Sequence, residues 1–422
     1  MELGLLFGGM FLLIAIGVPI GFAIGGACIA TMLIFPDISL LMIVQNCFTA
    51  LNSFPLMAIP FFILSGALMS SGGIAKRLLN AANAIFGFLT GGLALVSTAS
   101  CMFFGAVSGS GVATTSAIGG FMIPEMERHG YDKSFSSALV AASGTIGVII
   151  PPSIPFVMYS VATGTPVSDM FKAGFLPGIM MGVALMIVSY FISKKQHYGV
   201  KTNFIGFRAL LRTLWDAKWA LLSPVIILGG IYSGLFTPTE ASIVAVIYSY
   251  IIGRFVYKEL DTRGVIEVLK ESGVLNAVTT FMLTFSTTFS TFITMKQIPQ
   301  TLSSFLIGVT DNHFLLLLMI NVFLLIVGCL IDILPATLIL APILLPVAKS
   351  LGLGAVHFGI IMTVNLAVGF ITPPYGINLF TACAVSNLPI EKITKKIIPF
   401  LLALIAVLMV LTYVPAISEF LL

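Results

Sequence analysis

The sequence predicts an all-α protein whose helices cross a membrane many times, and three observations support this. Of the 422 residues, 58% are hydrophobic and only 9% are charged, whereas roughly a quarter of the residues of a soluble domain are charged. The apolar residues form continuous runs of about 20 residues, as membrane-spanning helices require, without the alternation of barrel strands. The second half of the chain also repeats a pattern of the first half at a fixed offset.

Composition and charge exclude several classes of protein. So apolar a chain is neither a soluble enzyme nor a disordered segment, and a net charge of +4 over 422 residues is too small for a nucleic-acid-binding protein. The five cysteines lie singly inside apolar runs, which predicts packing residues rather than disulfides or a metal site. The first basic residue is Lys76, so we expect no cleavable signal peptide.

Charged residues and turn signals divide the chain into apolar stretches that we expect to be helical. In order, these are 3–33, 40–55, 56–71, 84–107, 112–124, 134–165, 173–193, 220–236, 239–256, 272–294, 300–330, 334–348, 355–386 and 397–418. The blocks 84–124 and 300–348 each hold two half-length segments joined by a polar turn, which predicts two re-entrant hairpins. The stretches 134–165 and 355–386 each contain a Pro-Pro pair, which predicts broken helices because proline cannot continue the helical hydrogen bonding.

These elements predict two halves joined by a linker. Residues 1–193 would hold scaffold helices with the first hairpin and broken helix, and residues 220–422 would hold scaffold helices with the second pair. The linker 194–219 is typical of an amphipathic helix on the cytoplasmic interface, with Trp215 and Trp219 in the aromatic belt. We expect it to be an anchoring arm and assign it no chemistry.

The distribution of lysine and arginine predicts the orientation in the membrane. If the two blocks are re-entrant and the broken helices cross, only Lys172, Lys296 and Lys349 fall on one side, and the other 17 of the 20 basic residues fall on the opposite side. The positive-inside rule then puts the larger group in the cytoplasm and both termini outside. Full crossings instead of hairpins would scatter the basic clusters over both faces, so the charge distribution favours re-entrance.

An offset of 222 residues aligns positions 109–178 with the second half of the chain without a gap. The coinciding pairs are Thr115/Thr337, Pro124/Pro346, Gly130/Gly352, Gly147/Gly369, Ile149/Ile371, Pro151/Pro373, Pro152/Pro374, Ala162/Ala384 and Pro177/Pro399. Most are glycine or proline, whose positions report backbone breaks. The two copies have opposite orientations in the membrane: Arg128 and Lys133 of the first copy lie on the cytoplasmic side, and Lys349 of the second lies on the outer side. Such inverted repeats with discontinuous helices are typical of secondary transporters.

Each repeat is expected to hold one cation between its hairpin turn and the facing helix break. The turns 106–116 and 328–337 carry small and polar residues, and unwound carbonyls at membrane depth are tolerated only where they line a cavity or hold an ion. The repeat pairs Ser110 with Asp332, the only acid deep in an apolar block, which makes Asp332 a candidate for ion or substrate contact.

The deep parts of both repeats contain no lysine, arginine or histidine. An anionic substrate would therefore be held by half-helix N-termini, hydroxyl groups and bound cations. A proton relay needs a chain of titratable groups, and the deep parts of the repeats offer only one acid, so we expect coupling to sodium instead.

Motifs along essentially the whole chain resemble the large membrane subunit of tripartite ATP-independent periplasmic (TRAP) transporters. The most specific are Ala58-Ile-Pro-Phe-Phe-Ile-Leu-Ser-Gly, Ala106-Val-Ser-Gly-Ser-Gly, Gly147-Val-Ile-Ile-Pro-Pro-Ser, Ala341-Pro-Ile-Leu-Leu-Pro, His357-Phe-Gly-Ile-Ile-Met and Thr372-Pro-Pro-Tyr-Gly-Ile-Asn-Leu-Phe. The resemblance implies a sodium-driven, elevator-type importer of the bacterial inner membrane that uses at least two sodium ions. Its implied partners are a separate small four-helix membrane subunit, a periplasmic solute-binding protein that delivers an acidic substrate, and membrane lipid, with no nucleic acid.

By position, the resemblance implies two sodium sites with the substrate between the two turns. The first sodium site would comprise Ser108, Ser110, Gly144, Val148 and Pro151. The second would comprise Gly328, Asp332, Gly369 and Thr372. The implied substrate-binding residues are Ser110, Thr114, Ser153, Thr337 and Asn378. Sialic acid, C4-dicarboxylates and sugar acids all stay open as substrates, with a lean to sialic acid from overall similarity.

The main alternative is a single-component sodium/dicarboxylate or citrate carrier with the same inverted-repeat plan. The Ser-Asn-Thr hairpin triplets expected of such a carrier are absent from the sequence. An intramembrane enzyme would need a nucleophile with a base or a metal cluster, and the sequence shows neither, so we expect no enzyme. A passive channel would not need cation-sized sites in both repeats.

Overall fold

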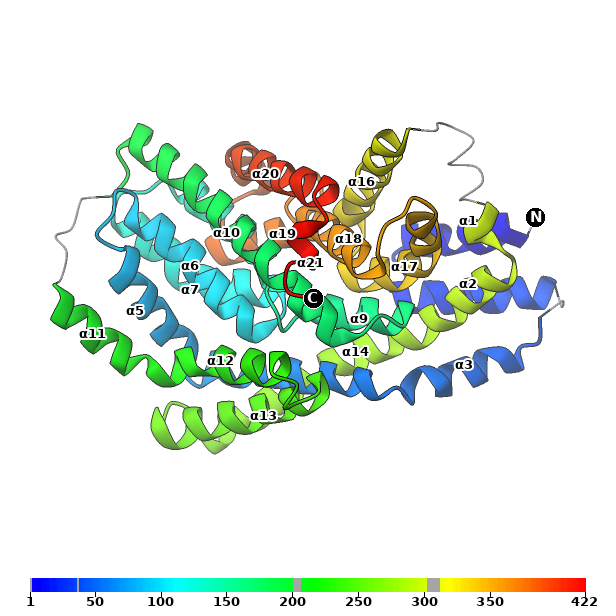
Figure 1. The fold of residues 1–422 in the computed structure, drawn as a ribbon, viewed down its shortest axis with the longest axis horizontal. Coiled ribbons are helices and arrows are strands. Elements are labelled where there is room, and N and C mark those ends of the chain that lie inside the picture. The colour runs from blue at the N-terminus through cyan, green and yellow to red at the C-terminus, as the bar shows by residue number, and fades with distance from the viewer. Residues whose placement is uncertain (1, 36–37, 200–205, 302–311) are drawn as a thin grey trace.

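The structure is a computed structural model that describes residues 2–35, 38–199, 206–301 and 312–422 (Figure 1). Every regular element in these ranges is helical, which confirms the predicted all-α class. Among the described residues, six helices are long and apolar enough to cross a membrane, or seven if one bent pair counts as a single span. The chain is therefore organised as a multi-pass membrane protein.

The first half of the chain contains ten α-helices and two 3-10 helices among its described residues. They are α1 (Glu2–Ala15), α2 (Ile20–Ile34), α3 (Leu41–Leu51), η1 (Phe54–Met57), α4 (Ala58–Ser71), α5 (Ile74–Phe86), α6 (Gly92–Ser108), α7 (Gly111–Arg128), α8 (Lys133–Gly144), η2 (Thr145–Val148), α9 (Ile154–Thr163) and α10 (Val167–Gln196). The single stretch predicted at 3–33 is two helices that pack on each other. Gly17 is left-handed (φ 89°) and Pro19 has no backbone N–H, so the helix ends there.

The second half follows the same plan. Its described elements are α11 (Phe207–Asp216), α12 (Lys218–Tyr232), α13 (Pro238–Ile251), η3 (Ile252–Val256), α14 (Thr262–Met295), α16 (His313–Leu330), α17 (Ile333–Ser350), α18 (Ala355–Gly369), α19 (Ile377–Ser386), α20 (Ile390–Tyr413) and α21 (Ala416–Glu419). The predicted hairpins are α6–α7 and α16–α17, and the predicted broken helices are α8–α9 and α18–α19. The first hairpin block was predicted to begin at residue 84, but residues 84–86 belong to α5. In the second block, residues 302–311 lie outside the described residues.

The two repeats exchange their second half-helices. The first hairpin, α6–α7, packs on α8, whereas α19 from the second repeat packs on α7 and α8. In the second repeat α18 packs on α16 and α17, and α9 from the first repeat packs on α17. This crossing brings both helix breaks and both hairpin turns to the centre of one bundle.

Two scaffold helices face the hairpins. The 34-residue helix α14 packs along α2, α3 and α4 and also contacts α17. Helix α4 packs on α13 and on α6 of the first hairpin. The repeats are thus held against a frame formed by α1–α4 and α12–α14.

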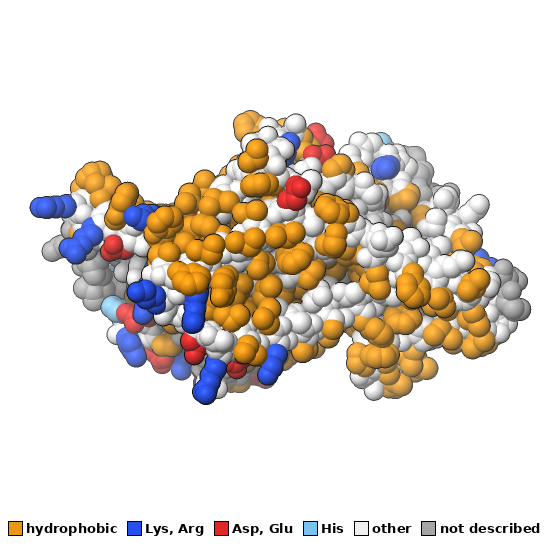
Figure 2. Space-filling model, turned by 90° about the horizontal axis from the view of Figure 1, so that it is seen from below, with side chains coloured by type: hydrophobic (Ala, Val, Ile, Leu, Met, Phe, Trp, Pro, Cys, Tyr) orange, Lys and Arg blue, Asp and Glu red, His pale blue; other side chains and the backbone are white. Residues whose placement is uncertain are grey.

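Basic side chains gather at one end of the molecule. Figure 2 shows most lysine and arginine side chains at its left-hand end and hydrophobic side chains over the middle. Helix α11 lies at that end in Figure 1 and meets α12 at 62°. It exposes Phe207, Leu211 and Trp215, which are spaced four residues apart and so lie on one face of the helix. This apolar stripe suits a helix that lies in the membrane interface, although residues 200–205 of the predicted linker lie outside the described residues.

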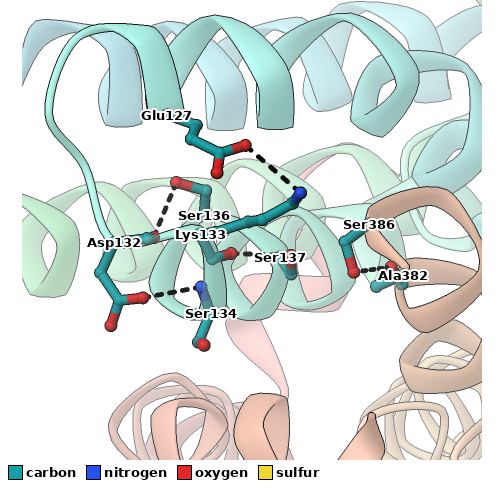
Figure 3. A network of polar contacts seen from close by, with 8 residues as sticks. All are labelled: Glu127, Asp132, Lys133, Ser134, Ser136, Ser137, Ala382 and Ser386. Carbon is teal, nitrogen blue, oxygen red and sulfur yellow. Dashed lines mark hydrogen bonds and ion pairs between the residues drawn. The ribbon is translucent and has the colours of Figure 1, made fainter. Parts of the chain in front are cut away.

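The loop between α7 and α8 ties the first hairpin to its neighbours (Figure 3). The Asp132 carboxylate accepts a hydrogen bond from the Ser134 backbone N–H (2.8 Å) and so caps α8. Lys133 pairs with Glu127 of α7 (3.3 Å), and Asp132 pairs with Lys396 of α20 (3.3 Å). These pairs are partly exposed, so they fix the arrangement of the three helices more than they add stability.

Each hairpin lies so close to its broken helix that only glycine fits at the contact. A Cβ atom on Gly105 of α6 would lie 2.7 Å from the Cα of Gly147 in η2. In the second repeat, a Cβ on Gly369 would overlap the backbone of Gly328. Contacts this close require backbone against backbone, which explains why glycines recur at these positions.

We expect Gly105→Val to destabilise the folded hairpin, because its side chain has no space and neither backbone can retreat. Overpacking typically costs about 1–3 kcal/mol. Thermal unfolding of the purified protein should show a lower midpoint. Gly120→Val on α7, where nothing lies within 4 Å of the added Cβ, is the matched control and should not lower the midpoint. Equal midpoints for both variants would contradict the close contact.

Candidate functional site

Hydrogen bonds from its own hydroxyl groups shape the first hairpin turn. Gly109 ends α6 in the left-handed conformation (φ 62°), and Ser110 caps α7 by accepting the Ala113 N–H (3.3 Å). Thr114 Oγ1 donates to the Ser110 carbonyl (2.7 Å) and lies 3.1 Å from Ser108 Oγ. Ser108, Ser110 and Thr114 therefore form one oxygen-rich cluster at the tip of the hairpin.

The first helix break faces that tip. Helix α8 tightens into η2, and the chain then passes through Pro151–Pro152 before Ser153 caps α9. Ser153 Oγ accepts the Phe156 N–H (3.3 Å) and donates to the Val148 carbonyl (2.6 Å). The Gly109 carbonyl lies 3.5 Å from the Ile154 backbone nitrogen, so the turn and the break touch. The structure thus brings Ser108, Ser110, Val148 and Pro151 to one locality.

Gly144, the remaining member of the predicted first sodium site, packs against α7. A Cβ on Gly144 would overlap Thr115 Oγ1, a fully buried oxygen that has no hydrogen-bond partner in the described part of the chain. The same Cβ would be 3.1 Å from the Gly111 carbonyl. Gly144 therefore packs against the first turn of α7 and not against the hairpin tip itself.

The second hairpin turn is built around an acid. Asp332 caps α17 by accepting the Leu334 N–H (2.9 Å). Facing it, Thr372 Oγ1 donates to the Val368 carbonyl (3.0 Å), and the Thr372 carbonyl accepts from Cys329 Sγ (3.1 Å). With the Gly328–Gly369 contact, all four residues of the predicted second sodium site lie along the contact between this hairpin and its break.

The two turns share a small cavity of about 60 Å³. Its lining residues are Gly109, Ser110, Gly111, Val112, Val148, Ile154, Pro155, Asp332, Ile333, Leu334 and Phe370. They include the first residues of α7, α9 and α17, so three helix N-termini meet at this cavity. Each N-terminus carries a partial positive charge and free N–H groups, which favour an anion. Asp332 supplies a carboxylate, so groups that favour an anion and a group that favours a cation line the same cavity.

A larger cavity of about 300 Å³ adjoins the small one. Ser110 and Ile154 line both, and the remaining walls of the larger cavity come from the first hairpin and from scaffold helices α4 and α14. The sequence did not point to these scaffold residues. Serines in apolar helices usually bond to their own helix and give no pattern that marks a binding wall.

The predicted substrate residues differ in where they lie. Ser110 lines both cavities, whereas Thr114 and Ser153 stand behind the lining and support the first turn and break. Thr337 and Asn378 are fully buried and line neither cavity. Asn378 instead donates to the Ala141 carbonyl (3.2 Å) and so links α19 to α8. Three of the five residues therefore gather at the first turn and its break, Asn378 lies behind Gly111 of that turn, and Thr337 is buried in the packing of α17.

Comparison with known proteins assigns the chain to a family. Residues 7–417 match the family model described as "Tripartite ATP-independent periplasmic transporter, DctM component". The chain is 45% identical over 419 residues to the isethionate TRAP transporter permease protein DctMQ of Oleidesulfovibrio alaskensis, covering 99% of this chain and 66% of that longer protein. It is 41% identical to the C4-dicarboxylate TRAP transporter large permease protein DctM of Pseudomonas aeruginosa (92% and 91% covered). It is 37% identical to the sialic acid TRAP transporter large permease protein SiaM of Vibrio cholerae (98% and 96% covered).

A solved structure supports the fold. The YdaH transporter of Alcanivorax borkumensis, whose crystal structure was described as having an unusual topology, superposes with a TM-score of 0.63 at 16% sequence identity. The match covers 88% of this chain and 86% of that one. The relatives are permease subunits and not enzymes. The helical fold with its two facing turns and the match over nearly the whole length lead to one conclusion: the chain belongs to the DctM family of tripartite ATP-independent periplasmic transporter components.

Proposed function

We propose that this chain is the large permease subunit of a sodium-coupled importer for an acidic small solute. The observation that carries the proposal is the 60 Å³ cavity, where three helix N-termini meet opposite Asp332. Such a cavity binds an anion poorly unless a cation neutralises the acid beside it, and that requirement couples the two ligands.

Sodium fits the oxygen atoms that the two sites offer. The first site supplies hydroxyls and carbonyls of Ser108, Ser110 and Val148, and the second supplies the Asp332 carboxylate with Thr372. Hard cations prefer such oxygen ligands. The described residues contain no group of three or more His, Cys, Asp or Glu side chains that could hold another metal. Two symmetric sites support at least two sodium ions in each cycle.

The relatives indicate the class of substrate and partner. Their names specify isethionate, C4-dicarboxylates and sialic acid, which all carry a sulfonate or carboxylate group. We propose that a periplasmic binding protein delivers such an acid, and that a small four-helix membrane subunit completes the complex in the bacterial inner membrane. The basic end of the molecule would face the cytoplasm and both termini the periplasm. The hairpins and broken helices would move as one elevator body along α4 and α14.

Uptake is expected to require external sodium and to survive collapse of the proton gradient, because the two turns offer cation ligands but no chain of titratable groups. The measurement is uptake of labelled acid into proteoliposomes that hold the complete complex, with the binding protein outside and the sodium gradient and voltage held constant. Uptake that needs no sodium and is driven by a pH difference across the membrane would contradict this proposal.

Asp332→Asn should weaken sodium binding without unfolding the protein. Asparagine still accepts the Leu334 N–H as a helix cap but carries no charge. Losing a charged ligand should raise the half-saturating sodium concentration about tenfold, the equivalent of 1.4 kcal/mol. The matched control is Asp132→Asn, which caps α8 with the same geometry (2.8 Å) but lies outside the cavities. The same sodium dependence in both variants would show that Asp332 only caps its helix.

Transport of a monoanion should be electrogenic, because two sodium ions carried with one negative charge move a net charge of +1. One charge moved through 100 mV releases about 2.3 kcal/mol, which adds roughly 40-fold to accumulation. An inside-negative potassium diffusion potential set with valinomycin should raise the initial rate, and the reversed potential should lower it. A rate that is equal at both polarities would rule out two sodium ions per monoanion.

A further inference from the structure

Asn378 is a fully buried amide that lines neither cavity, yet its side chain joins the two repeats beside the first hairpin. Its Nδ2 donates to the Ala141 carbonyl in the last turn of α8 (3.2 Å). An added Cβ on Gly111, the first residue of α7, would lie 3.4 Å from the same nitrogen. The amide of the second repeat therefore lies where α8 ends and α7 begins.

The first helix break creates the need for this bond. In an unbroken helix the Thr145 N–H bonds the Ala141 carbonyl. Where α8 tightens into η2, this N–H bonds the Ala142 and Ser143 carbonyls instead. A carbonyl that loses its helical donor inside a membrane needs another one. Asn378 supplies that donor, so the end of α8 is capped from the other half of the chain.

Asn378 also closes the second helix break. Its backbone N–H bonds the Phe370 carbonyl (3.1 Å), across the segment that contains Thr372. Phe370 lines the small cavity, and an added Cβ on Gly111 would lie 3.4 Å from its ring. One residue thus fixes the second break through its backbone and the end of α8 through its side chain.

Two other buried hydrogen bonds have similar chemistry but different positions. Tyr159 Oη donates to the Ala355 carbonyl (2.7 Å) and also joins the repeats, but at the end of α18 that lies opposite its break. Asn321 is a fully buried amide that donates to Thr412 of α20 (3.0 Å) and stays within the second half of the chain. Neither bond connects the end of α8 with the second break, so both residues provide matched controls.

We infer that Asn378 is a positioning residue that couples the two sodium sites. An ion at Asp332 and Thr372 orders the second break, which holds Asn378 where it caps α8. An ion at Ser110 and Val148 orders the first break, which presents the carbonyl that Asn378 bonds. Because the first ion has already ordered the shared contact, the second ion binds more tightly. This inference rests on the proposed function and adds the coupling between its two cation sites.

The test measures sodium binding to the purified complex of this chain with its small membrane subunit. Sodium chloride is titrated against choline chloride at constant ionic strength. Backbone hydrogen exchange in peptides that cover 106–116 and 328–337 reports each site separately, because a bound ion slows the opening of its own turn. In the wild type, both turns should gain protection over the same range of sodium concentration.

Weakening the second site alone reveals the coupling. Asp332→Asn should raise the sodium concentration that half-protects the first turn about fivefold, although Asp332 belongs to the other turn. When Asn378→Ala is added, Asp332→Asn should shift only the second turn. With Asn321→Ala or Tyr159→Phe instead, Asp332→Asn should still shift both turns. Asn378→Val, which refills most of the volume without a donor, tests the same bond if Asn378→Ala does not assemble.

The outcomes distinguish this inference from the proposed function. If sodium protects neither turn of the wild-type complex, the proposed function fails and the inference with it. If sodium protects both turns but Asp332→Asn shifts only the second, the sites are independent and the inference alone is overturned. It is also overturned if the shift of the first turn is as large with Asn378→Ala as with Asn321→Ala.

Discussion

The structure depends on one constraint: backbone N–H and C=O groups inside a membrane must find partners within the protein. A helix satisfies its own groups, but the breaks before the two Pro-Pro pairs leave some of them free. Those groups are tolerated because each break faces a hairpin turn, where the Gly109 carbonyl approaches the Ile154 N–H and Cys329 donates to the Thr372 carbonyl, while Ser153 bonds the Val148 carbonyl within the first break itself. The glycine contacts of both repeats follow from this need for close approach.

The same breaks concentrate charge at the centre of the bundle. Each new helix start exposes N–H groups, and three such starts meet at the small cavity. The second repeat adds a carboxylate where the first has Ser110, so the pseudo-symmetric site is not symmetric in charge. Positive helix ends favour a bound anion and a buried carboxylate favours a bound cation, and the proposed coupling of the two ligands rests on this arrangement.

The scaffold adds a different kind of chemistry. The repeats provide backbone groups and a carboxylate at the small cavity, and helices α4 and α14 provide serines and Glu271 to the wall of the larger one.

The sequence by itself determined the helices, both breaks, both turns and the inverted repeat, because proline and glycine act on the backbone locally and leave a pattern that survives in one chain. It also placed Ser110 and Asp332 at the two turns, where both line the small cavity, since a polar turn inside an apolar block is a local signal. Only the tertiary structure decided that α9 and α19 exchange partners, which places Asn378 against Ala141 and removes it, with Thr337, from the cavities. It also decided that Glu271 and Ser272 of α14 line the larger cavity together with Ser110. These contacts join residues more than 150 positions apart, and packing sets them through the shapes of whole helices, for which no local pattern exists.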